Sequence, residues 1–344
     1  MPLANRLLQL LSPESAHAVS MAGLDGLWAL RLSGLVAGAV EPDPRVCMGL
    51  EFANPIGLAA GLDKNADHID ALGALGFGSI EVGTVTPRPQ PGNPKPRLFR
   101  LPEHEAIINR MGFNNKGLDH MVRRLRQRRY TGVLGVNIGK NATTPLEHAL
   151  SDYQRCLVQV HPYSDYITVN LSSPNTPDLR QLQFGEALRR LVGSLREECS
   201  RLDAEQGRKV PLVVKIAPDM TDDDLYAVAD TLAEACVDGI IATNTTIDRS
   251  GLGDHPKASE AGGLSGLPVR DKSTDIIQKL HRHLGGSIPI IGVGGVSDQN
   301  SAQQKREAGA SLLQLYTGFI YRGADAITDA AIGFRQGIAP NSVK

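Results

Sequence analysis

Residues 56–64 read IGLAAGLDK, five small or apolar residues followed by a glycine and then by a turn that carries two charges. A short, continuous apolar run of this kind is typical of a strand buried on both faces, as in a parallel sheet. The pattern recurs along the chain in Ile56–Ala60, Ser79–Val85, Val133–Ile138, Tyr166–Leu171, Leu212–Ala217, Gly239–Thr243, Pro289–Val293 and Leu312–Tyr316. Helical patterns separate the runs, for example Ala66–Gly76, Gly185–Leu202, Asp222–Ala235 and Thr274–His283. Eight βα units in succession predict an α/β fold, a (β/α)8 TIM barrel.

Nearly every apolar run ends in glycine or in polar residues. In chain order these ends are Gly61 to Lys64, Gly83 with Thr84, Asn137, Asn170 with Ser172 and Ser173, Lys215, Thr243 with Asn244, Gly294 with Gly295, and Thr317 with Gly318. The carboxyl ends of barrel strands meet at one mouth, where barrel enzymes keep their chemistry. We therefore expect the functional site at this mouth.

The last two strand ends are rich in small residues. Gly292–Gly295 and Tyr316–Gly318 stand where many barrels bind a phosphate group, because small residues let backbone N–H groups approach its oxygens. Neither a Rossmann glycine fingerprint nor a Walker loop is present.

Neutral hydrogen-bonding side chains and two lysines make up most of the rest of the mouth. Asn137, Asn170, Asn175 and Asn244 suit the imide edges of a flat heterocycle. Lys215, at the end of a buried strand, either stabilises negative charge on a cofactor ring or forms a Schiff base, as in aldolases. No carboxylate cluster or histidine pair suggests a divalent metal, so no metal is expected.

Composition narrows the function classes. The chain has 344 residues, of which 41% are hydrophobic, and its 36 basic and 37 acidic residues give a net charge of −1. This balance excludes disorder and argues against nucleic-acid binding, which normally requires a basic surplus. The four cysteines form no C-x-x-C and have no histidine at metal-ligand spacing, so we expect reduced thiols.

The first 40 residues form a separate apolar segment. Leucines at helical spacing over residues 3–11, and a second pattern after Ser12 and Pro13, predict two helices with Ser12 as the second N-cap. Asp25 and Arg31 interrupt the apolar run, so neither a membrane-spanning helix nor a signal peptide is expected. The pair either packs on the barrel as ordinary helices or lies in a membrane surface.

Two connections are too long for simple crossovers. One contains the proline-rich segment 86–92 and the segment 109–115, and the other is the glycine-rich segment 248–263. Long insertions at the active face of a barrel usually act as lids or binding loops.

Six segments together resemble the quinone-dependent (class 2) dihydroorotate dehydrogenases. They are Asn54–Asn65, Ile80–Pro87, Asn109–Asn115, Asn170–Pro177, Lys215–Pro218 and Tyr316–Gly318. The resemblance runs from about residue 45 to the carboxyl end, and the amino-terminal extension also looks like that family's. It divides the chain into an extension, residues 1–40, that contacts quinone and membrane, and an FMN-binding barrel, residues 45–344.

The resemblance implies oxidation of dihydroorotate to orotate on FMN, in pyrimidine biosynthesis, with the electrons passed to a membrane quinone. The positions that resemble the family's FMN contacts are Ala60, Gly61, Leu62, Asp63, Lys64, Thr84, Asn137, Asn170, Lys215, Thr243, Gly266, Gly295, Tyr316 and Thr317. Those that resemble its substrate contacts are Lys64, Asn109, Arg110, Met111, Gly112, Phe113, Asn170, Asn175, Asn244 and Thr245. Ser173 matches the catalytic base, where the soluble relatives have cysteine, and His17 and Arg100 match positions at the quinone entrance.

The chemistry agrees with these roles. Forming the C5=C6 double bond removes a hydride, which the flavin takes, and a proton from C5, for which the protein must supply a base. A serine hydroxyl is a weak base alone, so we expect a relay through Thr176 and a water under Phe113. Lys64 would bind the substrate carboxylate, and Lys215 would offset the charge of the reduced flavin.

One residue departs from the family pattern. Asp178 stands where the family usually has glycine, which shifts the loop beside Ser173 if that position has a positive φ.

The absence of a long transit peptide and of a spanning helix favours a peripheral protein on the cytoplasmic face of a bacterial inner membrane. The alternatives are an FMN barrel that takes electrons from a nicotinamide, a Schiff-base aldolase on Lys215, and a non-enzymatic membrane-attached module.

Overall fold

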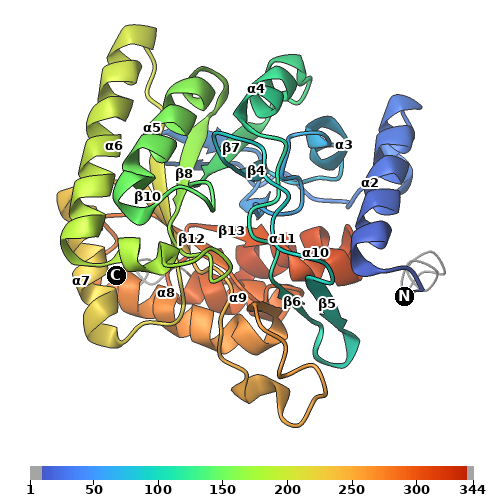
Figure 1. The fold of residues 1–344 in the computed structure, drawn as a ribbon. Coiled ribbons are helices and arrows are strands. Elements are labelled where there is room, and N and C mark those ends of the chain that lie inside the picture. Colours follow the sequence, from blue (N-terminus) through green and yellow to red (C-terminus); the bar gives the residue numbers. More distant parts are fainter. Residues whose placement is uncertain (1–9, 339–344) are drawn as a thin grey trace.

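A closed barrel of parallel strands forms the body of the computed structural model, which describes residues 10–338 (Figure 1). Around the barrel the strands follow the order β10-β12-β13-β3-β4-β7-β8-β9. Their bounds are β3 Ile56–Leu58, β4 Ser79–Val85, β7 Val133–Ile138, β8 Tyr166–Asn170, β9 Leu212–Ile216, β10 Gly239–Ala242, β12 Ile290–Val293 and β13 Leu312–Leu315. The predicted TIM barrel is confirmed. Several strands end one or two residues before the predicted runs do, because the last residues of those runs already turn into the mouth.

Helices follow the strands and cover the outside of the barrel (Figure 1). They are α3 Ile69–Gly73, α4 Leu118–Gln127, α5 Ala149–Val160, α6 Gly185–Gln206, α7 Asp222–Glu234, α8 Arg270–Leu284, α9 Gln299–Glu307, α10 Thr317–Arg322 and α11 Asp325–Gln336. The sequence sets several of their ends. Thr221 caps α7 by accepting a hydrogen bond from the Asp224 N–H, and Asp298 and Ser301 form a capping box at α9. Gly285, with φ 59°, ends α8.

Short 3-10 helices complete the connections. They are η1 Ser33–Leu35, η2 Pro102–His104, η3 Leu146–His148, η4 His161–Tyr163, η5 Leu179–Gln183, η6 Ser250–Leu252 and η7 Leu267–Val269.

The barrel interior is mostly apolar but contains a deeply buried carboxylate with polar partners. Every residue of the eight barrel strands is buried. Glu81 of β4 is fully buried and accepts hydrogen bonds from Asn137, Tyr166, Thr168 and Gln314. Four donors satisfy a charge that would otherwise be costly to bury.

The two long insertions form a small sheet rather than irregular loops. β5 Leu98–Leu101, β6 Ala106–Asn109 and β11 Gly263–Gly266 pair antiparallel in the order β11-β6-β5. Segments about 150 residues apart in sequence thus become neighbours, as in the pair Asn109–Gly263. A separate hairpin, β1 Arg45–Cys47 with β2 Leu50–Phe52, precedes the barrel.

The amino-terminal extension contributes helix α2, Pro13–Ala29, next to α3 at the edge of the molecule (Figure 1). Ser12 caps it through the Ser15 N–H at 3.2 Å, as predicted. The other predicted helix, over residues 3–11, falls almost wholly outside the described residues. Within residues 10–338, no helix is long and apolar enough to cross a membrane.

Polar contacts fasten α2 to the barrel. Arg97, at the start of the β5 insertion, donates two hydrogen bonds to the Glu14 carboxylate, at 2.9 and 3.2 Å. Asp25 bonds to the His68 ring at 2.7 Å. Large apolar side chains nevertheless stay exposed from the start of α2 to the segment after it, namely Leu10, Leu11, Val19, Leu30, Leu32, Leu35 and Val36.

Candidate active site at the barrel mouth

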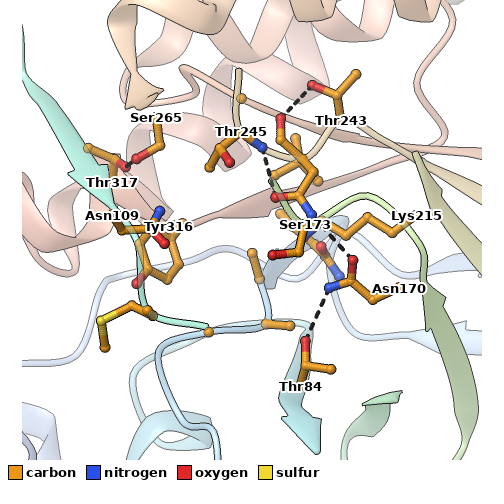
Figure 2. Close-up of a pocket in the computed structure, with 18 of the residues that line it drawn as sticks. Thr84, Asn109, Asn170, Ser173, Lys215, Thr243, Thr245, Ser265, Tyr316 and Thr317 are labelled. Carbon is orange, nitrogen blue, oxygen red and sulfur yellow. Dashed lines mark hydrogen bonds between the residues drawn. The ribbon is translucent and has the colours of Figure 1, made fainter. Parts of the chain in front are cut away.

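A cavity of about 980 Å³, open to solvent, lies at the carboxyl ends of the barrel strands. This mouth is where barrel enzymes bind their ligands. Most of the predicted site residues line it: Ala60, Gly61, Lys64, Thr84, Asn109, Met111, Gly112, Phe113, Asn170, Ser173, Asn175, Lys215, Thr243, Asn244, Thr245, Gly295, Tyr316 and Thr317. Figure 2 shows Ser173, Asn170 and Lys215 on one side of the pocket, and Tyr316 with the bonded pair Ser265–Thr317 on the other.

Five predicted contacts do not line the cavity: Leu62, Asp63, Asn137, Arg110 and Gly266. Asp63 accepts hydrogen bonds from the backbone N–H groups of Asn65, Asp67 and His68, so it shapes the turn that carries Lys64. Arg110 forms an ion pair with Glu260 at 2.6 Å.

Gly266 is held in its place by close backbone packing. It has φ 97°, and a Cβ there would lie 2.1 Å from the Glu105 carbonyl oxygen. Only glycine fits this approach.

A chain of side-chain amides runs up from the barrel core to the pocket wall. Asn137 donates to Glu81 at 2.8 Å, which leaves its amide oxygen to accept from Thr84 at 2.5 Å and from Asn170 at 3.2 Å. The Asn170 oxygen in turn accepts from Asn244 at 3.3 Å. A carboxylate only accepts, so Glu81 fixes which end of the Asn137 amide points upward. Asn137 thus supports the pocket from below.

Lys215 is buried and Lys64 is half-buried, and neither of these two mouth lysines has a carboxylate partner in the described chain. The Lys64 ammonium donates to the Gly61 carbonyl at 2.7 Å, and burial, together with Arg97, lowers the pKa of Lys64 to about 8. The Lys215 ammonium has no hydrogen-bond partner among residues 10–338, and burial lowers the pKa of Lys215 against the opposing effect of Glu81. Two cations with free donors in one pocket favour an anionic ligand.

The loop after β8 carries Ser173 and is held from several sides. Ser173 Oγ accepts from the Asn175 N–H at 3.2 Å, and the Asn175 side chain donates to Asn109 at 3.2 Å. Asp178 has φ 58°, so this position does require the left-handed conformation that glycine adopts most easily. Its carboxylate accepts from Gln181 at 2.9 Å.

The glycine-rich ends of β12 and β13 close the far side of the pocket. Gly295 has φ 68°, and a Cβ there would lie 2.4 Å from the Arg270 side chain. A Cβ on Gly318 would lie 2.2 Å from the Val296 carbonyl. Backbone atoms therefore form this wall, as the expected phosphate position requires.

Comparison with known proteins adds the family. The dihydroorotate dehydrogenase family model matches residues 45–334. The chain belongs to the dihydroorotate dehydrogenase family.

Similar relatives carry the name dihydroorotate dehydrogenase (quinone). That of Marinobacter nauticus is 57% identical over 337 residues, 98% of this chain and 99% of the relative. That of Cellvibrio japonicus is 58% identical over 327 residues, 95% and 96% of the two chains. Among solved structures, DHODH from Eimeria tenella in complex with ferulenol has a TM-score of 0.83 and 37% identity, covering 94% of this chain and 90% of that one. The predicted family is confirmed.

Sequence reasoning for this dihydroorotate dehydrogenase family member missed several lining residues, among them Ser265, Val269 and Gln314. Gln314 had a signal, since it is the polar residue in the otherwise apolar run LLQL of β13. The Ser265 and Thr317 hydroxyls are hydrogen-bonded at 2.8 Å only because the insertion strand β11 crosses the mouth.

The two predicted quinone-entrance residues lie where α2 meets the barrel rather than in the main pocket. Burial, together with the positive charges of Lys64 and His68, lowers the pKa of His17 to about 4, against the opposing effect of Glu14. His17 is therefore a neighbour of the turn that carries Lys64. Arg100 of β5 donates to the Leu11 carbonyl just before α2.

One cysteine does have a histidine neighbour in space. His161, Cys199 and Asp203 bring their ligand atoms within 4.8 Å of one another, a proximity that sequence spacing could not reveal. These groups are already hydrogen-bonded within the protein: His161 bonds to Asp203 at 2.9 Å, and the Cys199 thiol donates to the Val210 carbonyl at 3.3 Å. The cluster fastens α6 to the barrel.

Proposed function

We propose that this chain is a quinone-dependent dihydroorotate dehydrogenase, which oxidises dihydroorotate to orotate in pyrimidine biosynthesis. The observation that carries the proposal is the pocket itself. Ser173 lies in it together with Lys64 and Lys215, which have no carboxylate partner in the described chain, and with the side-chain amides of Asn109, Asn175 and Asn244. The chain is also 57% identical to a relative of that name. The lysines suit an anionic substrate and the amides suit its ring.

FMN is the proposed cofactor, and the residues fit it. The wall at Gly295 and Gly318 has no room for side chains, and a glycine-rich turn of this kind would let backbone N–H groups bind the phosphate. Gln314 lines the pocket, and its side-chain oxygen is buried with no hydrogen-bond partner in the described chain. Lys215 would lie at the ring, where its charge stabilises the reduced form. When bound, the flavin accepts the hydride that leaves C6 of dihydroorotate.

The protein supplies the other half of the oxidation. Lys64 binds the substrate carboxylate, and the amides of Asn109, Asn175 and Asn244 hold the ring edges. Ser173 Oγ takes the proton from C5, and the C5–H electron pair then forms the C5=C6 bond as the hydride departs. Arg110, held by Glu260, and the backbone from Met111 to Phe113 close the substrate side.

Thr176 is the proposed relay for the Ser173 proton. Its hydroxyl is buried and lacks a hydrogen-bond partner among residues 10–338. Buried polar atoms are normally paired, so an unpaired hydroxyl three residues from the base fits a water-mediated proton path. Phe113, itself buried, would cover that water.

The extension is the proposed route to the quinone. Residues 1–40 would lie in the surface of the bacterial inner membrane, on its cytoplasmic face, and residues 45–344 would form the catalytic barrel. The exposed leucines of this segment support the proposal, because apolar side chains at a membrane surface leave water. His17 and Arg100 would line the path between the membrane and the flavin edge.

Anaerobic reduction followed by reoxidation tests the function. We expect dihydroorotate to bleach the yellow protein, and a quinone, but not NAD, to restore its colour. Reoxidation by NAD would indicate the nicotinamide-linked alternative. A colourless protein that borohydride traps on Lys215 with a carbonyl substrate would overturn the proposal in favour of an aldolase.

A further inference from the structure

Lys305 is a buried lysine outside the site described above. It lies on α9 and is fully buried. Its ammonium group donates only to neutral oxygens, those of Ser273 and Thr274 at 3.0 Å each and the Arg270 carbonyl at 3.4 Å. No carboxylate in the described chain lies within ion-pair distance of it.

These three acceptors belong to the first turn of α8, which forms the back of the glycine-rich wall. Ser273 Oγ donates to the Val293 carbonyl at 2.5 Å, the residue before Gly294. A Cβ on Gly294 would lie 3.0 Å from the Ser273 side chain, and one on Gly295 2.4 Å from Arg270. Val293, Gly294 and Gly295 all line the pocket. Lys305 is therefore one side chain behind the surface that faces the ligand.

A cation in this position is unfavourable for the protein alone. Burying an ammonium without a counter-ion is costly, and the positive end of the α8 dipole adds repulsion, which the carboxyl end of α9, where Lys305 itself lies, offsets only in part. Burial lowers the pKa of Lys305 to about 7, with Asp271 opposing and Arg270 adding to the effect. An anion on the pocket side of the Gly294–Gly295 turn would lie across from Ser273, whose hydroxyl accepts from Lys305.

We propose that Lys305 is a positioning residue for the phosphate group of FMN, holding the Gly294–Gly295 turn through Ser273 and favouring a dianion on the pocket side. The inference rests on the proposed function, since it requires FMN in this pocket. Lys305 does not touch the phosphate. It acts through the first turn of α8 and through its charge.

Binding of FMN and of riboflavin, which lacks the phosphate, separates this role from a structural one. The full chain carries the Lys305→Met change, and flavin release on dilution is followed by fluorescence for each ligand. We expect FMN to bind about tenfold more weakly than to the unchanged chain. Riboflavin affinity should change less than about twofold, because no phosphate is involved. Lys279→Met, on the exposed face of α8 beside Asp222 and Asp275, is the matched control and should change neither.

Equal weakening of both flavins, or no weakening of either, would overturn the inference. If Lys305→Met does not fold, Ser273→Ala gives the same test. It removes the link to Val293 but keeps the charge, so a selective loss for FMN supports the inference and a non-selective one overturns it. An unchanged chain that binds neither flavin would instead overturn the proposed function.

Discussion

The barrel mouth and helix α2 handle polar and apolar groups in opposite ways. At the mouth, polar groups are buried: Glu81, Asn137 and Asn170 have almost no contact with water and are paired with one another. On α2 and the segment after it, apolar groups are exposed, with Leu30 70% and Leu35 75% accessible. Each arrangement is costly for an isolated protein, and each becomes favourable when a partner arrives.

The difference indicates which kind of binding partner each region favours. Buried, pre-oriented polar groups discriminate between small polar ligands, because an unmatched donor or acceptor is costly in a dry site. Exposed leucines have no such selectivity and favour any apolar surface in proportion to the area buried. This contrast supports the proposed roles, a defined substrate at the mouth and a membrane surface for the extension.

Removing the base should give the largest effect. Ser173→Ala leaves the pocket walls intact but takes away the acceptor for the C5 proton, so flavin reduction by dihydroorotate should slow by about 10²–10⁴-fold at neutral pH. Stopped-flow absorbance under anaerobic conditions measures the rate. Flavin content should stay normal, and the exposed Ser151→Ala is the control. Full-rate reduction would show that the mouth does not need this hydroxyl.

The pH dependence of kcat/KM tests whether burial lowers the pKa of Lys64 at the mouth. Lys64 must be protonated to bind a carboxylate, and its pKa of about 8 lies below the ordinary lysine value because the side chain is buried. The kcat/KM for dihydroorotate should therefore fall about tenfold per pH unit above pH 8, since the ammonium form is lost there. A profile that stays flat to pH 10 would contradict this role.

Replacing exposed leucines of the extension by aspartate tests whether the extension binds a membrane surface. In the Leu30→Asp/Leu35→Asp double variant no buried contact is lost, yet binding to phospholipid vesicles should weaken by about tenfold or more. Co-sedimentation measures it, and dihydroorotate-dependent flavin reduction should not change. Val46→Asp, at an exposed valine of β1, is the matched control. Because the net charge is only −1, wild-type binding should depend weakly on salt.

The contact between Glu14 of α2 and Arg97 of the barrel should stabilise the protein less at acid pH. Burial raises the pKa of Glu14, but hydrogen bonds from Arg97 and Lys95 outweigh it, so the pKa lies below the ordinary glutamate value of 4.5. The pair therefore stabilises the fold above that value and is lost as pH falls through the lower, folded-state pKa. Glu14→Gln should lower stability at pH 7 by about 1–3 kcal/mol, because the guanidinium of Arg97 stays buried. Thermal unfolding at pH 7 and pH 3 measures the difference, which should shrink at pH 3.

Substitutions of Asp178, in the loop that follows Ser173, should have the smallest effect, a change in the free energy of unfolding. Asp178 has φ 58°, so Asp178→Gly should raise stability by about 1 kcal/mol, less a small loss from its bond to Gln181. Asp178→Ala, which keeps the strain and loses the bond, should lower it. Denaturant unfolding measures both. Equal stability of the glycine and alanine variants would mean that the loop relaxes around the residue.

The sequence by itself determined the barrel, its mouth and the family. Continuous apolar runs such as Ser79–Val85 form buried parallel strands, and the residues that end them must meet at one rim, whatever else the chain does. Ser173, Lys64 and Lys215 were therefore identifiable as mouth residues from their positions, whereas their expected roles came from the family resemblance. The Ser12 cap was equally local, because it depends on the adjacent turn.

The tertiary structure decided what depends on contacts between distant segments. Only folding brings β11 against β6, so that Ser265 reaches Thr317, and only folding assigns Asp63 and Asn137 to supporting rather than lining roles. The burial of Lys64 and Lys305, and hence their lowered pKa values, depends on side chains packed from several elements. Local pattern sets which strand a residue ends, whereas packing sets its solvation and its partners, and these decide its chemistry.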